Sequence, residues 1–184
     1  MTKGIQLVTL RCPRCNSDLT GGKEGVFLYC PHCGAGFEII EEELHPINVD
    51  FVTAVDEPKE FLPFWAFDAQ LQLKTREAKS TLFGSPKGLI HLFEERGKLR
   101  LYVPAYVEGL EERTPRALDL TYGQPELRPV KRLQQLDHLA ISQSDARKIA
   151  DYLLITSEVE QSDTLRRLEY ILHLDNPFVI VIGF

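Results

Sequence analysis

The sequence predicts an α+β fold in which a small cysteine-rich β module precedes a mostly antiparallel β-sheet with one or two helices. Three observations lead to this prediction. Two C-x2-C pairs lie within residues 12–33, apolar and polar residues alternate over residues 61–74, and apolar residues recur at helical spacing over residues 146–154. These patterns are typical of metal-binding knuckles, of a half-buried strand and of an amphipathic helix, respectively.

The composition is that of a folded globular protein with two parts. At 184 residues the chain is long enough for a small module and one medium domain, and its 43% hydrophobic and 26% charged residues are typical of globular proteins. No basic-then-apolar signal begins the sequence, and the apolar run at residues 178–184 is too short to cross a bilayer. We therefore expect a cytoplasmic protein without a transmembrane segment.

The cysteines indicate a site for one metal ion. Two C-x2-C turns can place four thiolates at the corners of a tetrahedron. Sulfur ligands in this arrangement suit Zn(II), and four protein ligands leave no open position for water or substrate. We therefore expect one structural zinc ion. The predicted ligands are Cys12, Cys15, Cys30 and Cys33.

Other uses of the cysteines fit the sequence less well. Two disulfides are disfavoured because nothing marks the chain for export, and a redox-active dithiol would not need a matched second pair. Iron in a four-sulfur site shares the zinc geometry, so that alternative stays open. The turn chemistry supports the knuckles, because Asn16 and Gly34, which follow the second cysteine of each pair, tolerate positive φ.

Residues 8–40 resemble a zinc ribbon. The four cysteines carry the resemblance, together with apolar strands at residues 26–30 and 37–40 that enter and leave the second pair. Zinc ribbons occur in transcription factors, polymerase subunits, replication and translation proteins and many adaptors, so the resemblance implies a fold and a metal rather than a function. We assign residues 1–44 to the ribbon.

An acidic stretch separates the ribbon from the rest of the chain. Residues 41–60 carry seven Asp or Glu against one Lys, and Pro46 and Pro58 interrupt regular structure. We predict a tethered linker at residues 45–58, part of which could instead dock as a strand. An α+β domain is predicted at residues 59–184.

The α+β domain is predicted to begin with strands. The alternation over residues 61–74 predicts a strand with one apolar face. Residues 89–94 and 98–107 predict two further strands, joined as a hairpin through Glu95-Arg96-Gly97.

Aromatic residues gather around two prolines, in LPFWAF and in VPAYVE. They either form an exposed platform for a protein partner or repeat strand-edge geometry inside a sheet core, and we favour the core. The candidate partner-binding residues are Phe61, Phe64, Trp65 and Tyr106.

The last part of the chain predicts a helix and then strands. LAISQSDARKIADYLLITSEVE has helical periodicity, and its Ser142 and Asp145 approximate a capping box. Residues 164–184 predict a strand, an Asp-Asn-Pro turn and a second strand, with a short helix at residues 164–172 as the alternative. The apolar end of the chain should either tuck into the core or be covered by a partner.

No catalytic motif accompanies these elements. The ribbon, the LPFW strand and the capped helix together resemble uncharacterised zinc-ribbon proteins of bacteria and archaea. The sequence contains no G-x-x-x-x-G-K-[ST] loop, no G-x-S-x-G elbow and no H-E-x-x-H pair. Every cysteine is assigned to the metal. We therefore expect no enzyme activity, no catalytic residue and no small-molecule substrate.

Two functions fit this pattern. The first is a non-catalytic zinc-binding adaptor or accessory subunit that mediates protein–protein interaction in a larger assembly. The alternative is nucleic-acid binding in transcription or replication through the ribbon and the basic stretch at residues 74–100, with Phe27 or Tyr29 stacking on a base. The net charge of −6 disfavours the alternative. Its candidate contacts are Arg11, Arg14, Lys23, Lys74 and Arg76.

Overall fold

The computed structural model describes residues 10–21, 26–79, 88–107, 110–131, 136, 138–161 and 164–184. Within these residues two β-sheets are accompanied by three helices, so the fold is mixed α+β with mostly sheet. One sheet has four strands and belongs to the N-terminal segment, and the other has five strands. The number of helices exceeds the predicted one or two.

The four-stranded sheet contains the cysteine-rich segment. Neighbouring strands are antiparallel and follow in chain order: β1 (Thr20–Gly21), β2 (Phe27–Tyr29), β3 (Gly36–Ile40) and β4 (Glu43–Ile47). Glu41 and Glu42 join β3 to β4, and both have positive φ, 50° and 68°, as a two-residue hairpin turn requires. This turn extends the small sheet to Ile47.

The strand β5 (Val49–Thr53) follows directly. It lies parallel to the last strand, β9 (Thr164–Gly183), and the short β8 (Arg128–Pro129) pairs with its other edge. The side chains of Phe51 and Val52 are buried, whereas Asp50 faces water. Residues 45–58 therefore hold parts of both sheets, which agrees with the predicted alternative of a docked strand rather than with a linker, because burial of the apolar side chains outweighs the local negative charge.

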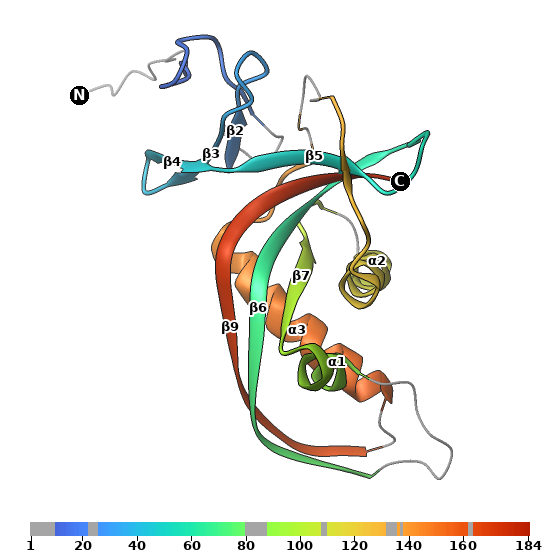
Figure 1. Ribbon diagram of the computed structural model, residues 1–184. Coiled ribbons are helices and arrows are strands. Elements are labelled where there is room, and N and C mark those ends of the chain that lie inside the picture. The colour runs from blue at the N-terminus through green and yellow to red at the C-terminus, as the bar shows by residue number, and fades with distance from the viewer. Residues whose placement is uncertain are drawn as a thin grey trace, which may run out of the picture.

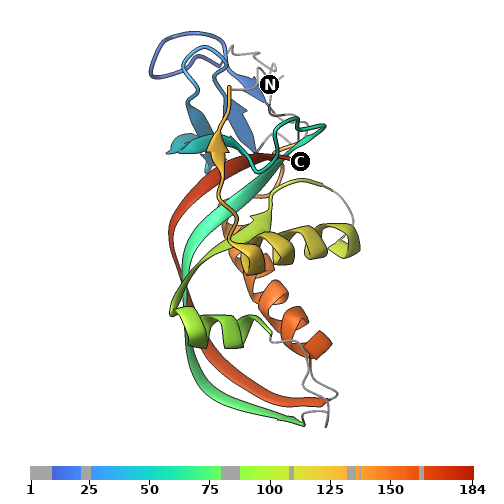
Figure 2. The same ribbon diagram turned by 45° about the vertical axis from the view of Figure 1, so that its right-hand side comes forward.

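Two long strands form the centre of the larger sheet. The strand β6 (Phe61–Lys79) pairs antiparallel with β9 along almost its whole length, and together they form a curved strand pair (Figure 1). The helices lie on the concave side of this strand pair (Figure 2). The strand β7 (Lys98–Pro104) pairs antiparallel with the other edge of β6. The strands predicted from residues 61 and 98 onward are thus confirmed.

The strand β9 continues through the Asp-Asn-Pro sequence, where a turn is predicted. The register slips between Ala66 and Asp68, so Asn176 and Pro177 together lie opposite Phe67. Asn176 has a φ of 47°. A β-bulge accommodates both this conformation and a proline that cannot donate a hydrogen bond. The predicted turn is wrong, and so is the alternative helix at residues 164–172.

The helix α1 (Leu89–Arg96) replaces the strand predicted at residues 89–94. Its N-terminal capping residue, Gly88, has no side chain to accept a hydrogen bond from the first turn. Side chains from a distant helix supply the acceptors: the N–H of Leu89 donates to Ser157 Oγ and the N–H of Ile90 donates to Glu158 Oε1, both at 3.1 Å. The helix thus depends on long-range contacts, which local alternation does not reveal.

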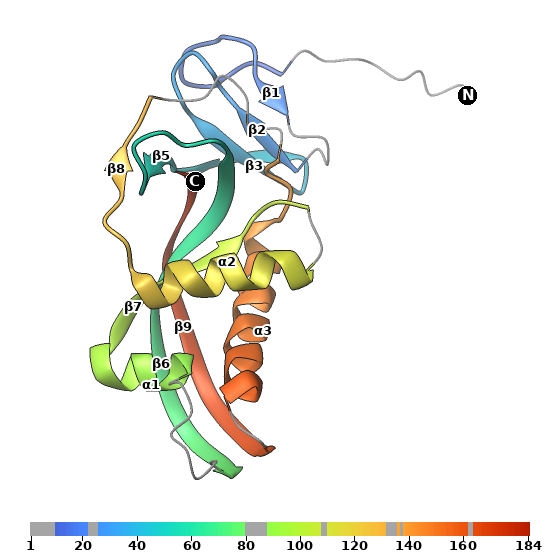
Figure 3. The same ribbon diagram turned by 90° about the vertical axis from the view of Figure 1, so that its right-hand side faces the viewer.

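The helix α2 (Leu110–Gly123), which the sequence pattern does not predict, covers the free edge of β7 (Figure 3). The N–H of Tyr102 donates to Thr121 Oγ1 at 3.2 Å. Gln124, just after the helix, accepts from the N–H of Arg100 at 3.1 Å and donates to its carbonyl oxygen at 2.7 Å. Side chains therefore take the place of a further strand and protect this edge from pairing with another chain.

The helix α3 (Gln143–Gln161) confirms the predicted amphipathic helix. The N–H of Asp145 donates to Ser142 Oγ at 3.1 Å, as the predicted capping box requires. The end of the chain is tucked in: the N–H of Phe184 donates to the Glu60 carbonyl at 2.9 Å, and its ring lies 6.1 Å from that of Phe64.

We expect Gly88→Ala to lower the free energy of unfolding by about 1–3 kcal/mol, because a Cβ at this position would overlap the buried Glu158 carboxylate. Gly123→Ala is the matched control, since nothing lies within 4 Å of a Cβ there. Its stability should change by less than about 1 kcal/mol. Urea denaturation of the two variants checks the prediction, and equal stabilities would contradict it.

Candidate metal centre

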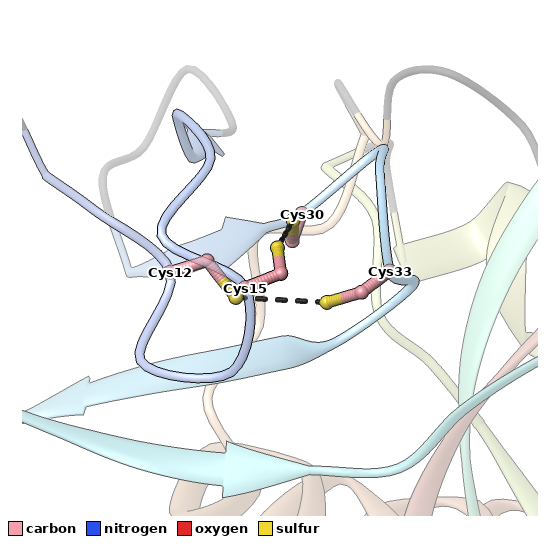
Figure 4. Close-up of side chains that lie close together, drawn as sticks. All are labelled: Cys12, Cys15, Cys30 and Cys33. Carbon is pink, nitrogen blue, oxygen red and sulfur yellow. Dashed lines mark hydrogen bonds between the residues drawn. The ribbon is translucent and has the colours of Figure 1, made fainter.

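The four cysteine side chains converge at one point beside the small sheet (Figure 4). Their sulfur atoms all lie within 4.8 Å of one another, with 3.6 Å between those of Cys12 and Cys33 and 3.4 Å between those of Cys15 and Cys30. Four sulfurs around one ion at about 2.3 Å would be separated by about 3.8 Å. All four are free thiols, so the alternative of two disulfides is not present. The cluster therefore has the dimensions to hold a metal ion.

The two knuckles that carry the cysteines fold alike. In the first, the N–H of Asn16 donates to the carbonyl of Cys12 at 2.8 Å, and in the second the N–H of Gly34 donates to the carbonyl of Cys30 at 2.8 Å. Asn16 has a φ of 58° and Gly34 a φ of 76°, which confirms the predicted turn chemistry. The repeated turn explains why two separate segments present their sulfurs in matching geometry.

The thiols differ in their readiness to ionise. Hydrogen bonds from the Ser17 hydroxyl and then from its backbone N–H lower the pKa of the Cys15 thiol to about 6. For Cys33, the hydrogen bond from the backbone of Ala35 lowers the pKa, but burial and the neighbouring thiols together raise it to about 12. Without a cation Cys15 therefore favours the thiolate at neutral pH and Cys33 the thiol, and a bound metal must displace the proton of Cys33.

The cluster is built onto the main core through β2. The side chain of Leu28 packs beneath the cysteines, whereas Phe27 and Tyr29 point to the opposite side. The ring of Phe27 lies 5.9 Å from that of Trp65, and the ring of Tyr29 lies 5.8 Å from that of Phe51. Both aromatic side chains are only 2% exposed, so they are not available to stack on a base in this structure.

A second link joins the small sheet to α3. Glu38 of β3 is 3% exposed, and its Oε1 accepts a hydrogen bond from the N–H of Gln143, the first residue of α3, at 2.8 Å. Burial raises the pKa of the Glu38 carboxyl, although the hydrogen bond from Gln143 opposes this effect. The carboxylate adds a second acceptor at a helix end that Ser142 already caps.

The four candidate partner-binding aromatics do not form an exposed platform. Phe64 and Trp65 are 0% exposed and Tyr106 is 2% exposed, while Phe61 is half-buried. Trp65 Nε1 donates to the carbonyl of Ile141 at 2.7 Å, which fixes its ring inside the core. The structure thus supports the interpretation of these residues as strand geometry in a sheet core.

The candidate nucleic-acid contacts do not gather on one surface. Arg11 pairs with Asp18 at 3.0 Å, and Arg76 pairs with the buried Glu158 at 3.1 Å. Arg14 is exposed in the turn of the first knuckle, Lys74 is exposed on β6, and Lys23 lies outside the described residues. Elsewhere in the basic stretch at residues 74–100, Lys98 and Arg100 both form ion pairs with Asp68.

Sequence reasoning missed two carboxylates that organise the site and the helices, Glu38 and Glu158. Glu158 had a usable signal, because Ser157 continues the helical spacing of Ala146, Ala150 and Leu153 on the buried face and Glu158 directly follows it. Glu38 had none, since a polar residue in a short strand normally faces water.

Comparisons of the chain with protein families, with curated proteins and with solved structures find no match. No helix among the described residues has the length and apolar character needed to cross a membrane. Functional inference therefore depends on the geometry of the cysteine cluster and of the surfaces around it.

We expect Cys30→Ser to abolish tight metal binding and to lower the free energy of unfolding by more than about 4 kcal/mol, the range associated with loss of a structural metal. His32→Ala is the matched control, because His32 lies exposed between two ligands and outside the cluster. Metal analysis after dialysis and denaturation measure the two effects. Metal retention by Cys30→Ser equal to that of His32→Ala would contradict this assignment.

Proposed function

We propose that the chain is a non-catalytic zinc-binding adaptor or accessory subunit that holds a protein partner in a larger assembly. The observation that carries the proposal is the set of four cysteine sulfurs within 4.8 Å of one another. Four protein thiolates saturate a tetrahedral Zn(II), which leaves no position for water or substrate and makes the ion structural. A cytoplasmic location belongs to the proposal, because reducing compartments keep such thiols free.

The position of the cluster supports a structural role for the ion. Cys12 is 2% exposed and Cys30 is 0% exposed, and β2 between the knuckles is buried on both faces. Metal binding in small sites of this kind is worth about 10–16 kcal/mol at neutral pH. An ion here would hold the ribbon in the shape that places Phe27 and Tyr29 in the main core.

Iron is the competing metal, since a four-sulfur site accepts either ion. Zinc has no redox chemistry and suits a site whose purpose is to shape the chain. A colourless protein with one zinc per chain is the outcome that the proposal requires, and a coloured protein with bound iron would overturn it.

Nucleic-acid binding stays the alternative function. It is disfavoured by the net charge of −6 and by the ion pairs that engage Arg11 and Arg76. Titration of single-stranded and double-stranded DNA and RNA at several salt concentrations separates the two functions. Tight binding that weakens steeply with salt would favour the alternative.

We expect the chain purified from its native source to contain one zinc per polypeptide and to elute with a protein partner in size-exclusion chromatography. Cys30→Ser, which removes a ligand, should lose both the zinc and the partner, whereas His32→Ala should keep both. Elemental analysis and mass spectrometry of the eluted fractions measure these outcomes. A zinc-loaded chain that elutes as a monomer at every concentration tried would contradict the adaptor function.

A further inference from the structure

The outer side of α3 carries an apolar stripe in addition to its buried face. The stripe consists of Tyr152, Ile155 and Val159, which are 43%, 44% and 54% exposed and lie three and four residues apart. Ala146, Ala150, Leu153 and Leu154, on the opposite side, are in the core. A surface helix normally needs one apolar face, so the second stripe is not explained by folding alone.

A groove between α2 and α3 borders this stripe. It encloses about 430 Å³. Tyr152 belongs to both the stripe and the groove, and makes them one continuous surface. The lining residues are Thr114, Pro115, Leu118, Asp119 and Tyr122 from α2 and Tyr152, Thr156 and Glu160 from α3.

The α3 side of the groove has the length of a short helix. Its α3 residues are spaced four apart from Tyr152 to Glu160, a distance of about 12 Å along the axis. The helix α2 crosses α3 at a steep angle (Figure 3), so its groove residues lie across this surface rather than along it. A surface of this length accepts about two turns of an amphipathic helix, whose apolar side chains follow the same i, i+3, i+4, i+7 spacing.

The charge of the groove is negative. Asp119 and Glu160 are its charged lining residues, and both are exposed. Burial raises the pKa of the Tyr122 hydroxyl, and the nearby carboxylates of Glu158 and Glu160 add to this effect. An occupant with lysine or arginine beside its apolar side chains would therefore be attracted, and one with carboxylates would be repelled.

We infer that the groove between α2 and α3 is the docking site for a basic amphipathic helix of a partner protein. Its apolar side chains contact Leu118, Tyr122 and Tyr152 and extend along the stripe, while its basic side chains face Asp119 and Glu160. This inference rests on the proposed adaptor function and specifies which surface and which chemistry the partner uses.

A model peptide tests the inference on the zinc-loaded full-length chain. The probe is a fluorescein-labelled 18-residue helix of leucine and lysine with leucines at i, i+3, i+4 and i+7, and the control peptide replaces lysine by glutamate. We expect the lysine peptide to bind at least about tenfold more tightly than the glutamate peptide, because Asp119 and Glu160 repel the carboxylates of the glutamate peptide. Fluorescence anisotropy measures both affinities. Equal affinities for the two peptides would overturn the inference.

Variants of the groove locate the binding. Tyr152→Ser should weaken the lysine peptide about tenfold, whereas Val55→Ser, which removes a side chain of similar exposure (40%) between β5 and β6, should leave it unchanged. Asp119→Lys combined with Glu160→Lys should reverse the preference between the peptides. Unchanged binding by Tyr152→Ser overturns the inference, and so does a dimer of the chain that Tyr152→Ser dissociates, because the occupant is then a second copy.

Complex formation in the native source, compared between the wild-type chain and Tyr152→Ser, distinguishes failure of this inference from failure of the adaptor function. Absence of any complex with the wild-type chain defeats the adaptor function. A complex that forms with the wild-type chain and persists in Tyr152→Ser defeats only the groove as its docking site.

Discussion

The antiparallel pairing of β6 with β9 is the constraint on which the other elements depend. The pairing joins Phe61 to Gly183 and Lys79 to Thr164, with residues 80–163 between the two strands. β7 adds to one edge of this pair and β5 adds to the other, while the helices cover the concave side (Figure 2). Because these contacts are remote in sequence, the loop-closure entropy must be offset by the burial of many side chains at once.

The ends and edges of the elements are completed by distant side chains. Glu38 of β3 accepts from the first N–H of α3, Glu158 of α3 accepts from the first turn of α1, and Gln124 satisfies the backbone of β7. Each of these groups would otherwise be a buried or poorly solvated polar atom without its hydrogen bond. The same contacts position each element against the next, so local hydrogen bonding and global arrangement are set together.

This arrangement explains what could be predicted from the sequence. The cysteine cluster, the knuckle turns, β6, β7 and α3 follow from local spacing, because two-residue and 3.6-residue periodicities record which side is buried. The helix α1 and the path of β9 through Asn176 could not be predicted. The first depends on acceptors contributed by α3, and the second on a bulge opposite Phe67 that only the pairing with β6 makes favourable. The linker prediction at residues 45–58 failed for a related reason. The negative charge of the segment is visible in the sequence, but the strand that pairs with β5 is not.

The candidate metal centre and the groove between α2 and α3 lie near different parts of α3. Glu38 reaches α3 at Gln143, about 13 Å along the axis from Tyr152 and about 25 Å from Glu160. Loss of the ion would disturb β2 and the contact at Gln143 first, while Ser142 continues to cap the helix through Asp145. The α3 residues of the groove lie in the second half of that helix, which is held by Ser157 and Glu158 against α1 and by Arg76 of β6. A bound ion would therefore stabilise the fold rather than switch the groove, and the proposed docking surface would keep its shape as long as the chain stays folded.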